Sequence, residues 1–287
     1  MPEPVAAPTD DDGRPLPPAV QAVEVQRCRA QGGPPADDTD AIAAEVPVAL
    51  SFNGLSHAVM MATPADLPAM ALGFALSEGL IASAAQCYEI EVTAGTLGCQ
   101  VELRIAQQAF AGLKEHRRAM EGRTGCGLCG VESLAALDLA PAPLPPSPPV
   151  EVAAVLRAMA QLAAHQPINA QTGGCHAAGW ALPDGTLQFA MEDVGRHNAL
   201  DKLIGRLAQA RQLGTPGFVV MSSRASYELV RKCARVGIAT LATVSAPSSL
   251  AVRIASEAGI TLYGFCRGER AVRYAGAPAL SGGRGPA

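Results

Sequence analysis

Hydrophobic residues in the second half of the chain form short runs that alternate with amphipathic stretches. Short apolar runs bounded by turn residues predict buried strands, and apolar residues repeated every three or four positions predict helices. The expected strands are residues 175–182, 186–191, 218–221, 238–244, 260–265 and 271–274. The expected helices are residues 152–162, 195–212, 227–235 and 250–257. This alternation is typical of a three-layer α/β/α domain with a largely parallel sheet.

The first half of the chain has a different pattern, in which apolar and polar residues alternate around turn signals. Residues 46–52 and 56–61 flank Asn53 and Gly54, a pair that favours the tight turn of a β-hairpin. Acidic residues alternate with apolar residues across positions 88–105, which predicts a second hairpin. We therefore expect a small α+β domain.

Thr63 and Pro64 predict the start of a helix between these two hairpins. A hydroxyl at the cap and a proline at the first helical position are both common at helix N-termini. Gly79 is expected to end this helix, and residues 110–120 form a further short amphipathic segment.

These patterns divide the chain into five segments. Residues 1–40 are rich in Pro, Asp, Ala and Gly without periodicity, which predicts a disordered tail. The α+β domain covers residues 41–122, and the α/β/α domain covers residues 151–275. Between them, residues 123–150 hold a Cys-x-x-Cys loop, a short expected helix and a stiff proline-rich linker. Residues 276–287 are expected to form a frayed tail.

Composition and charge exclude several classes of protein. The 287-residue chain has a formal net charge of −4, so we do not expect it to bind nucleic acid. It has no uninterrupted apolar run of transmembrane length and no signal-peptide pattern, so we expect no membrane association and a cytoplasmic location. Its eight cysteines are scattered, which favours free thiols in a reducing compartment over a disulfide framework.

Cys126 and Cys129 form the motif with the clearest chemistry. Glycines on both sides leave the loop free to move, and basic residues just upstream favour the thiolate, which is the nucleophilic form of cysteine. Such a pair can carry sulfur, exchange disulfides or bind a metal. A zinc site stays open as an interpretation, because Cys-x-x-Cys is also half of a zinc knuckle.

Two successive expected strands end in hydroxyl-rich turns, with Ser222, Ser223 and Arg224 after one strand and Ser245 after the next. In open α/β sheets, ligands bind beyond the carboxyl ends of the strands. Hydroxyls, backbone N–H groups and an arginine at such ends can hold phosphate. Each serine alone is better explained as a helix N-cap, but two such turns together favour an anionic ligand.

His197 and Asp201 lie in a stretch, residues 191–202, that is unusually dense in polar groups. Four residues apart on an expected helix, they would share one face, where an aspartate can orient an imidazole. Such pairs are more often only solvated, so both interpretations stay open.

Cys175 and His176 suggest zinc chemistry. Together with the Cys-x-x-Cys pair they would complete a Cys3His site, but an adjacent Cys and His rarely both bind one zinc ion. Zinc deaminases need His-x-Glu, and Ala178 stands where that glutamate should be. Deaminase activity is therefore excluded, although the deaminase fold is not.

Together these motifs resemble the formate dehydrogenase accessory sulfurtransferase family, FdhD. The resemblance runs in order through nearly all of residues 41–274. The matching segments are residues 62–67, 73–74, 76–81, 125–130, 172–177, 192–202, 222–224, 245–247 and 264–268. The resemblance implies that the C-terminal three-layer α/β/α domain is cytidine-deaminase-like and has lost deaminase chemistry.

The resemblance also implies a function. Members of this family accept sulfur as a cysteine persulfide from a cysteine desulfurase. They pass it to the molybdenum (or tungsten) bis(molybdopterin guanine dinucleotide) cofactor, a bound substrate that formate dehydrogenase then requires. Carried over by motif, Cys126 is the persulfide carrier and Cys129 assists it. The resemblance further implies a homodimer, and we expect no structural metal.

Candidate residues for binding this cofactor come from two sources. The family's cofactor-binding stretch corresponds to Phe265, Cys266, Arg267, Gly268, Glu269 and Arg270. The strand-end turns and the polar stretch add Ser222, Ser223, Arg224, Ser245, His197 and Asp201, which suit the guanine nucleotide moiety.

Three other functions would use the same residues differently. A non-catalytic carrier of the cofactor would need the serines and Arg224 but not Cys126. A thiol–disulfide oxidoreductase would need both cysteines, but the chain lacks the preceding aromatic residue and the early βαβ unit of thioredoxin-like motifs. A structural zinc site would bind metal at the Cys126–Cys129 pair.

Overall fold

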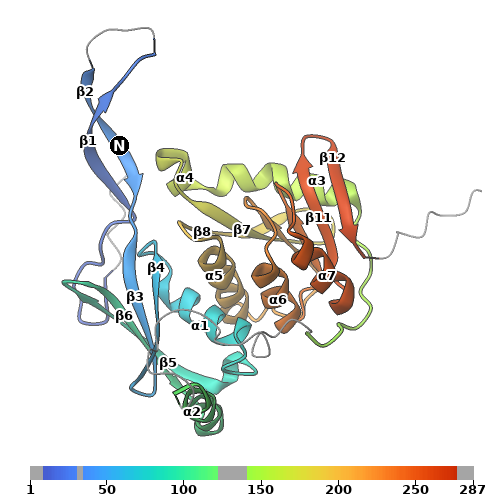
Figure 1. Ribbon diagram of the computed structural model, residues 1–287, viewed down its shortest axis with the longest axis horizontal. Helices are drawn as coiled ribbons and strands as arrows, with labels where there is room; N and C mark the ends of the chain where they lie inside the picture. Colours follow the sequence, from blue (N-terminus) through green and yellow to red (C-terminus); the bar gives the residue numbers. More distant parts are fainter. Residues whose placement is uncertain (1–8, 31–34, 122–140, 277–287) are drawn as a thin grey trace, which may run out of the picture.

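Three sheets organise the chain in a computed structural model that describes residues 9–30, 35–121 and 141–276, without the side chains of residues 116–121 (Figure 1). The strands of the first half are β1 (Val20–Arg27), β2 (Ala36–Ala43), β3 (Val46–Phe52), β4 (Leu55–Ala62), β5 (Cys87–Gly95) and β6 (Gly98–Ile105). Those of the second half are β7 (His176–Ala181), β8 (Leu187–Asp193), β9 (Phe218–Met221), β10 (Thr240–Thr243), β11 (Thr261–Arg267) and β12 (Arg270–Ala275). The α-helices are α1 (Leu67–Ser77), α2 (Gln107–Glu121), α3 (Val152–Leu162), α4 (Pro167–Thr172), α5 (Arg196–Gln209), α6 (Tyr227–Arg235) and α7 (Ser249–Ala258).

The four-stranded sheet contains both hairpins that the sequence predicts. β3 and β4 pair antiparallel around Asn53 and Gly54, whose positive φ angles of 47° and 78° suit a tight hairpin turn. β5 and β6 form the second hairpin, and β6 also pairs parallel with β3. The strand order is therefore β4-β3-β6-β5. The inward side chains of this sheet, such as Leu50 and Leu103, are fully buried.

The six-stranded sheet has the order β12-β11-β10-β9-β7-β8 and is mixed, which corrects the expectation of a largely parallel sheet. Only β9, β10 and β11 run parallel to one another. Short turns join β7 to β8 and β11 to β12, and such turns can join only antiparallel neighbours. α5, α6 and α7 cover one face of the sheet and α3 covers the other, so the expected α/β class is confirmed (Figure 1).

The main hydrophobic core is continuous between the two large sheets. It runs from the inner face of the four-stranded sheet through α1 and α5 to the six-stranded sheet. A smaller core lies between α3 and the opposite face of the six-stranded sheet and includes Val155, Leu162 and Phe218. Helix α1 packs directly on α5, where Gly73 faces the carbonyl of Asp201 and Gly205 faces the carbonyl of Ala69. The two expected domains are thus joined by a helix pair with almost no space between the backbones.

The expectation of a disordered tail is wrong for the described residues before position 41. β1 and β2 pair antiparallel over eight residues each, and Leu16 is 7% exposed in the main core. The valines of β1 have high β-propensity, a local signal that the proline- and aspartate-rich composition of the whole segment concealed. The short helix expected after Cys129 and the frayed end beyond residue 276 lie outside the described residues.

Helix α1 begins at Leu67, three residues later than the expected start at Pro64. Thr63 does not cap it. Instead, the Thr63 N–H donates to Asp193 Oδ2 over 3.0 Å, and the Thr63 hydroxyl accepts from the Val194 N–H over 3.2 Å. The Thr63 hydroxyl is therefore bonded to a residue far along the sequence rather than to the start of α1. Gly79, with φ of 74°, follows the end of the helix as expected.

Substituting Gly73→Ala should destabilise the protein by about 3 kcal/mol, because the added Cβ would overlap the carbonyl of Asp201 and neither helix backbone can move away cheaply. Urea denaturation at constant m-value measures this difference. Gly112→Ala is the matched control, since Gly112 lies within α2 and its added Cβ meets nothing. That control should gain up to about 1 kcal/mol from helix propensity, and an equal loss in both variants would contradict the close packing.

Candidate functional site

The carboxyl ends of β9, β10 and β11 lie side by side. What we call the rim consists of the turns after β9 and β10, residues 222–225 and 244–247, and the end of β11 with its turn into β12, residues 265–270. Backbone hydrogen bonds connect these turns. The Ala225 N–H donates to the Ala246 carbonyl over 3.3 Å, and the Phe265 N–H donates to the Ser245 carbonyl over 3.3 Å. The structure therefore brings together the two hydroxyl-rich turns and the 265–270 segment, which the sequence placed far apart.

Phe265 has an unusual backbone on this rim. Its φ is 52°, in the left-handed region that bulky residues rarely adopt, and its side chain is 43% exposed. A β-bulge between Gly264 and Arg267 accompanies this conformation. Gly264 itself lies close to Tyr274, Pro247 and the Ser245 carbonyl, so an added Cβ there would be crowded. The result is an aromatic ring presented to solvent at the end of β11.

Three arginines share the rim with this exposed ring. Arg224, Arg267 and Arg270 are all exposed. Arg267 Nε donates to the Val244 carbonyl over 2.9 Å, which holds its guanidinium beside the β10 turn. Gly268 has φ of 56° and, with Glu269, forms the turn between β11 and β12. Exposed guanidinium groups and an exposed aromatic ring on one rim are suited to an anionic ligand with a flat ring system.

Most of the serine hydroxyls at the rim form hydrogen bonds within the protein. Ser222 Oγ accepts from the Ala177 N–H over 2.8 Å, and Ser223 Oγ donates to the Arg224 carbonyl over 3.0 Å. Ser248 caps α7 by accepting from the Ala251 N–H, as the N-cap interpretation proposes. Ser245 contributes its carbonyl, which accepts from Phe265. Phosphate binding by serine side chains is therefore less favoured here than binding by arginine.

Cys266 lies in the 265–270 segment but faces the interior. It is fully buried, and burial raises the pKa of its thiol to about 11. A protonated, enclosed thiol is a poor nucleophile, so Cys266 contributes packing beneath the rim rather than chemistry on it.

His197 lies at the start of α5, where it meets partners that the sequence did not reveal. Its Nε2 is 3.3 Å from Ser226 Oγ and 3.4 Å from Glu228 Oε2. Burial lowers the pKa of His197, with Glu228 opposing and the charges of Arg196 and Lys232 adding to the decrease. Ser226 and Glu228 begin α6, and only the packing of α6 beside α5 places them next to His197.

Asp201 does not reach the rim. It is 1% exposed between α1, α5 and α6, where it accepts from Lys232 Nζ over 2.9 Å and from Ser77 Oγ over 2.6 Å. Burial raises the pKa of Asp201, with the Lys232 ammonium opposing. The expected His197–Asp201 pair is therefore absent from the contacts described, because each side chain has different partners.

The remaining polar residues of the 192–202 stretch also hold the fold together. Lys202 is fully buried and forms an ion pair with Asp193 at 2.7 Å. Asp193 also accepts from the Asn198 amide over 2.9 Å, and the Glu192 carboxylate accepts from two backbone N–H groups at the start of α4. The polar density of this stretch therefore reflects structural contacts at least as much as a ligand site.

Cys126 and Cys129 lie outside the described residues. The described cysteines, at positions 28, 87, 99, 175, 233 and 266, are free thiols. Within the described ranges, no group of three His, Cys, Asp or Glu side chains is arranged to hold a metal ion. No helix in the described part of the chain is both long and apolar enough to cross a membrane.

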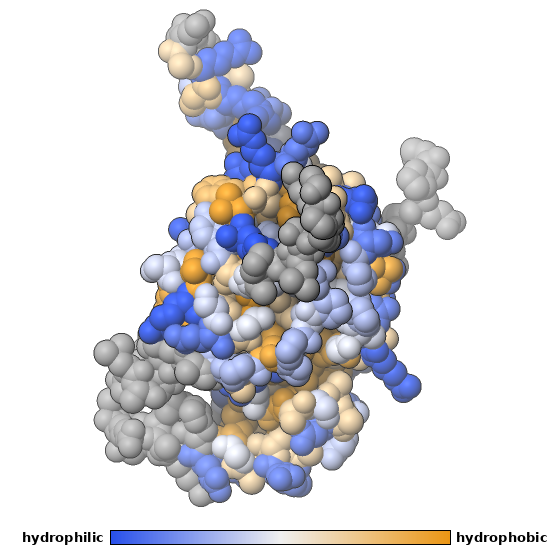
Figure 2. All heavy atoms as spheres, turned by 90° about the vertical axis from the view of Figure 1, so that its right-hand side faces the viewer, coloured by the Kyte–Doolittle hydropathy of each residue, from blue (hydrophilic) through white to orange (hydrophobic). Residues whose placement is uncertain are grey.

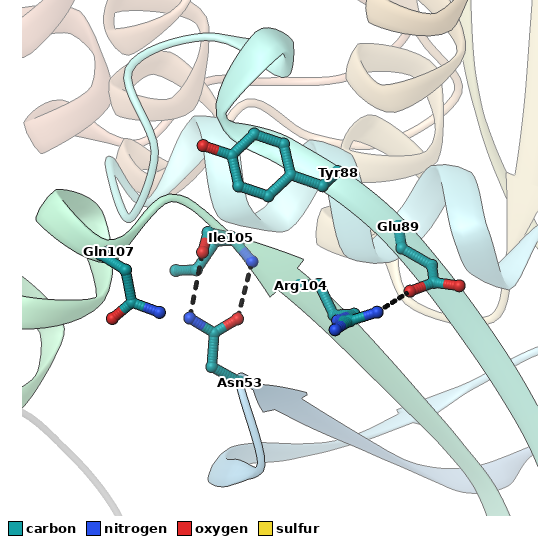
Figure 3. A pocket seen from close by; sticks show the side chains of 6 residues that line it. All are labelled: Asn53, Tyr88, Glu89, Arg104, Ile105 and Gln107. Carbon is teal, nitrogen blue, oxygen red and sulfur yellow. Dashed lines mark hydrogen bonds and ion pairs between the residues drawn. The ribbon is translucent and has the colours of Figure 1, made fainter.

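A depression of about 590 Å³ lies elsewhere, where the four-stranded sheet meets the start of α2 (Figure 3). Its polar lining is largely paired internally. The Asn53 side chain exchanges two hydrogen bonds with the Ile105 backbone, and Arg104 forms an ion pair with Glu89 at 2.7 Å. We assign no ligand to this depression.

Comparison with known proteins identifies the family. Residues 43–281 match the model of the FdhD/NarQ family. The chain belongs to the FdhD/NarQ family. It is 58% identical over 240 residues to the sulfur carrier protein FdhD of Chromobacterium violaceum, across 83% of this chain and 89% of that protein. It is 52% identical over 259 residues to the sulfur carrier protein FdhD of Burkholderia mallei, across 88% of this chain and 94% of that protein.

A solved structure shows the same fold in a distant relative. A protein from Desulfotalea psychrophila, provisionally described as a formate dehydrogenase accessory protein, superposes with a TM-score of 0.69 at 24% identity. The match covers 91% of this chain and 98% of that one. The two-domain α/β architecture is therefore shared between this FdhD/NarQ chain and that protein.

Acid should weaken the junction of α1 and α6 through Glu78. Burial alone raises the pKa of Glu78, but the charges of Lys232 at 2.8 Å and Arg231 at 2.7 Å outweigh it and lower the pKa to about 2. Because the pKa of Glu78 is lower in the folded state, its ionised carboxylate stabilises the fold at pH values above the unfolded-state pKa. This stabilisation is lost as the pH falls toward 2. The stability difference between wild type and Glu78→Gln should be on the order of 3 kcal/mol at pH 6 and approach zero near pH 2.

Urea denaturation across this pH range measures the difference. Glu89→Gln is the control, because the Glu89 side chain is 56% exposed and exposed ion pairs contribute little at any pH. A Glu78→Gln deficit that is the same at pH 2 and pH 6 would assign the loss to packing rather than charge.

Proposed function

We propose that this chain is a sulfurtransferase that carries sulfur on Cys126 to a molybdenum bis(molybdopterin guanine dinucleotide) substrate, for the benefit of formate dehydrogenase. Its relatives in two bacteria are named sulfur carrier proteins. The sequence supplies a glycine-flanked Cys-x-x-Cys pair, and the fold supplies a separate rim for a large anionic ligand. The donor in this proposal is the persulfide of a cysteine desulfurase.

The observation that carries the proposal is the exposed, conformationally strained Phe265 on the same rim as the exposed Arg224, Arg267 and Arg270. Strained residues persist mainly where function requires them. An aromatic ring can stack on a guanine base, and arginine can pair with phosphate oxygens through two parallel hydrogen bonds. A guanine dinucleotide presents both a flat base and a diphosphate, so it fits this combination.

One round of sulfur transfer needs no reductant beyond the two cysteines. The Cys126 thiolate attacks the outer sulfur of the donor persulfide, the S–S bond of the donor breaks, and the donor cysteine leaves as a thiolate. Only when the acceptor substrate is bound does Cys129 attack Cys126, which forms a disulfide and releases the carried sulfur as sulfide. The two electrons that reduce this sulfur come from the second thiolate. Cys126 thus carries the sulfur, and Cys129 releases it.

Several features of this proposal rest on family resemblance alone. They are the cysteine desulfurase as donor, the homodimer, the cytoplasmic location and the likeness of the second domain to cytidine deaminases. A non-catalytic carrier of the same cofactor is the main alternative, because it would use the same rim without the sulfur chemistry.

Intact-protein mass spectrometry after incubation with a cysteine desulfurase and free cysteine tests the carrier step. Wild type should gain one sulfur that a reductant removes, Cys126→Ala should gain none, and Cys129→Ala should retain the sulfur because it cannot release it. Cys28→Ala is the control, since Cys28 is exposed but has no role in the proposal. Absence of added sulfur in wild type, with nucleotide still bound, would favour the non-catalytic carrier.

Substituting Phe265→Gly should separate stability from ligand binding. Glycine adopts positive φ without strain, so the variant should gain about 1 kcal/mol of stability while binding of guanosine diphosphate weakens about tenfold through loss of stacking. Calorimetry measures the binding. Arg211→Gly is the control, because Arg211 is exposed with φ of 57° and lies outside the rim. Arg211→Gly should gain similar stability and bind guanosine diphosphate as tightly as wild type. If Phe265→Gly also binds guanosine diphosphate as tightly as wild type, the Phe265 ring is not part of the site.

A further inference from the structure

The sheet edge that carries the rim continues past β9. Because β7 runs antiparallel to both β9 and β8, the start of β7 and the end of β8 lie at this same edge. The Ser222 N–H donates to the Ala177 carbonyl over 3.0 Å, so His176 adjoins the first turn of the rim. Gly174 lies against Ala43 at the root of the β1–β2 hairpin, which Figures 1 and 2 show standing clear of the body. The hairpin root therefore borders this end of the rim.

Arg196, the first residue of α5, brings a guanidinium to this edge. Its Nε atom is buried and has no hydrogen-bond partner among the described residues. Burial lowers the pKa of both His176 and His197, and the positive charge of Arg196 lowers each pKa further. The guanidinium therefore lies close to both imidazoles. Buried guanidinium nitrogens ordinarily donate to an acceptor, so this N–H group is available to a ligand.

Two helix starts meet at the same place. His197 lies in the first turn of α5, and its Nε2 is 3.3 Å from the hydroxyl of Ser226, the residue before α6. Neither start is capped by a side chain, because Gly195 has none and the Ser226 hydroxyl does not bond to its own helix. The N–H groups of a first turn and the positive end of the helix dipole both attract anions.

The other charged groups around the two imidazoles leave this place positive. Glu228 Oε2 is 3.4 Å from His197 Nε2, and the more distant Lys232 adds positive charge from the same helix. Asp193 pairs across strands with His176, but its carboxylate already forms a buried ion pair within the fold. The His197 side chain is 34% exposed, so a ligand can reach it.

We propose that Arg196, His176 and His197 form an anion subsite of the rim, which binds a phosphate group of a nucleoside diphosphate. This inference rests on the proposed function, whose substrate carries such phosphates. Along the order β11-β10-β9-β7, the subsite lies three strand spacings, about 14 Å, from Phe265. The aromatic ring and the subsite are therefore separate contacts, one for the base and one for a phosphate. Arginine and protonated histidine both form charge-assisted hydrogen bonds to phosphate oxygens.

Phosphate binding at this subsite is coupled to proton uptake. In the free protein both imidazoles titrate below the ordinary histidine pKa of about 6.5. A bound phosphate places negative charge beside them and raises both pKa values. Phosphate binds imidazolium better than neutral imidazole, so its affinity increases as pH falls through the range between the pKa values of the free and bound states.

Calorimetric titration of the full chain with inorganic diphosphate tests the subsite. Wild type should bind diphosphate, Arg196→Gln should bind it about tenfold more weakly, and Arg196→Lys should recover part of the loss because it keeps the charge. Arg206→Gln is the matched control, since it makes the same charge change in the last turn of the same helix and should bind as wild type does. No binding by wild type, or equal affinities of Arg196→Gln and Arg206→Gln, would overturn the proposal.

The same titration in two buffers of different ionisation enthalpy measures proton uptake. Near pH 6, wild type should take up more protons per diphosphate than a variant with both His176→Gln and His197→Gln. The ligand's own protonation is the same in both titrations and cancels from the difference. His165→Gln is the control, because His165 is exposed on another part of the fold. Equal proton uptake by wild type and the double variant would remove the histidines from the subsite.

Ligand fragments distinguish this proposal from the proposed function. Arg196→Gln should bind guanosine, which lacks phosphate, as wild type does, and Phe265→Gly should bind inorganic diphosphate as wild type does. Loss of guanosine binding in Arg196→Gln would overturn the separation of the two contacts. Sulfur loading of Cys126 does not use the subsite. Loading without diphosphate binding would refute only the subsite, and diphosphate binding without loading would refute only the sulfur chemistry.

Discussion

The contact between α1 and α5 is the constraint on which the rest of the structure depends. Two glycines, Gly73 and Gly205, let the helix backbones approach, and buried charges fix their alignment. Lys202 pairs with Asp193 and Lys232 pairs with Asp201, all four being almost fully buried. Removing one member of such a pair leaves an uncompensated buried charge, which costs several kcal/mol. The small sheet and the large sheet are therefore held in one fixed relation.

Local sequence patterns predict most elements of this fold but not their neighbours in space. The strands and helices of the second half follow from apolar periodicity, because each is short and its pattern is local. The mixed strand order does not, since pairing depends on turns and crossovers. The start of α1 was misplaced because Thr63 bonds to Asp193 rather than to its own helix. The β1–β2 hairpin was missed because its valines lie within a segment of disorder-like composition.

The candidate site, like the fold, could be predicted from the sequence only in part. Arg224, Ser245 and Phe265 could be expected near one another, because ligands in α/β folds gather at strand ends and successive parallel strands are neighbours. The contact of His197 with Glu228 could not, since no spacing in the sequence links two helix starts. Asp201 was assigned to the ligand from its distance to His197 along a helix, yet helix packing directs it into the interior. A run of closely spaced polar residues indicates a structurally constrained segment, but it does not distinguish a ligand-binding site from buried ion pairs.

The strain at Phe265 connects the rigid fold to the proposed chemistry. β11 pairs with β10 on one side and with β12 on the other, and its register with β12 shifts between Leu262 and Tyr263 and again between Gly264 and Arg267. Gly264 lies close to Tyr274, Pro247 and the Ser245 carbonyl, and Phe265 directly after it adopts the left-handed region. Glycine would be the cheapest residue there, and a phenylalanine turned to solvent gains little from burial. A costly residue in an unfavourable conformation, on a rim with exposed arginines, fits the ligand contact that the proposed function assigns to this ring.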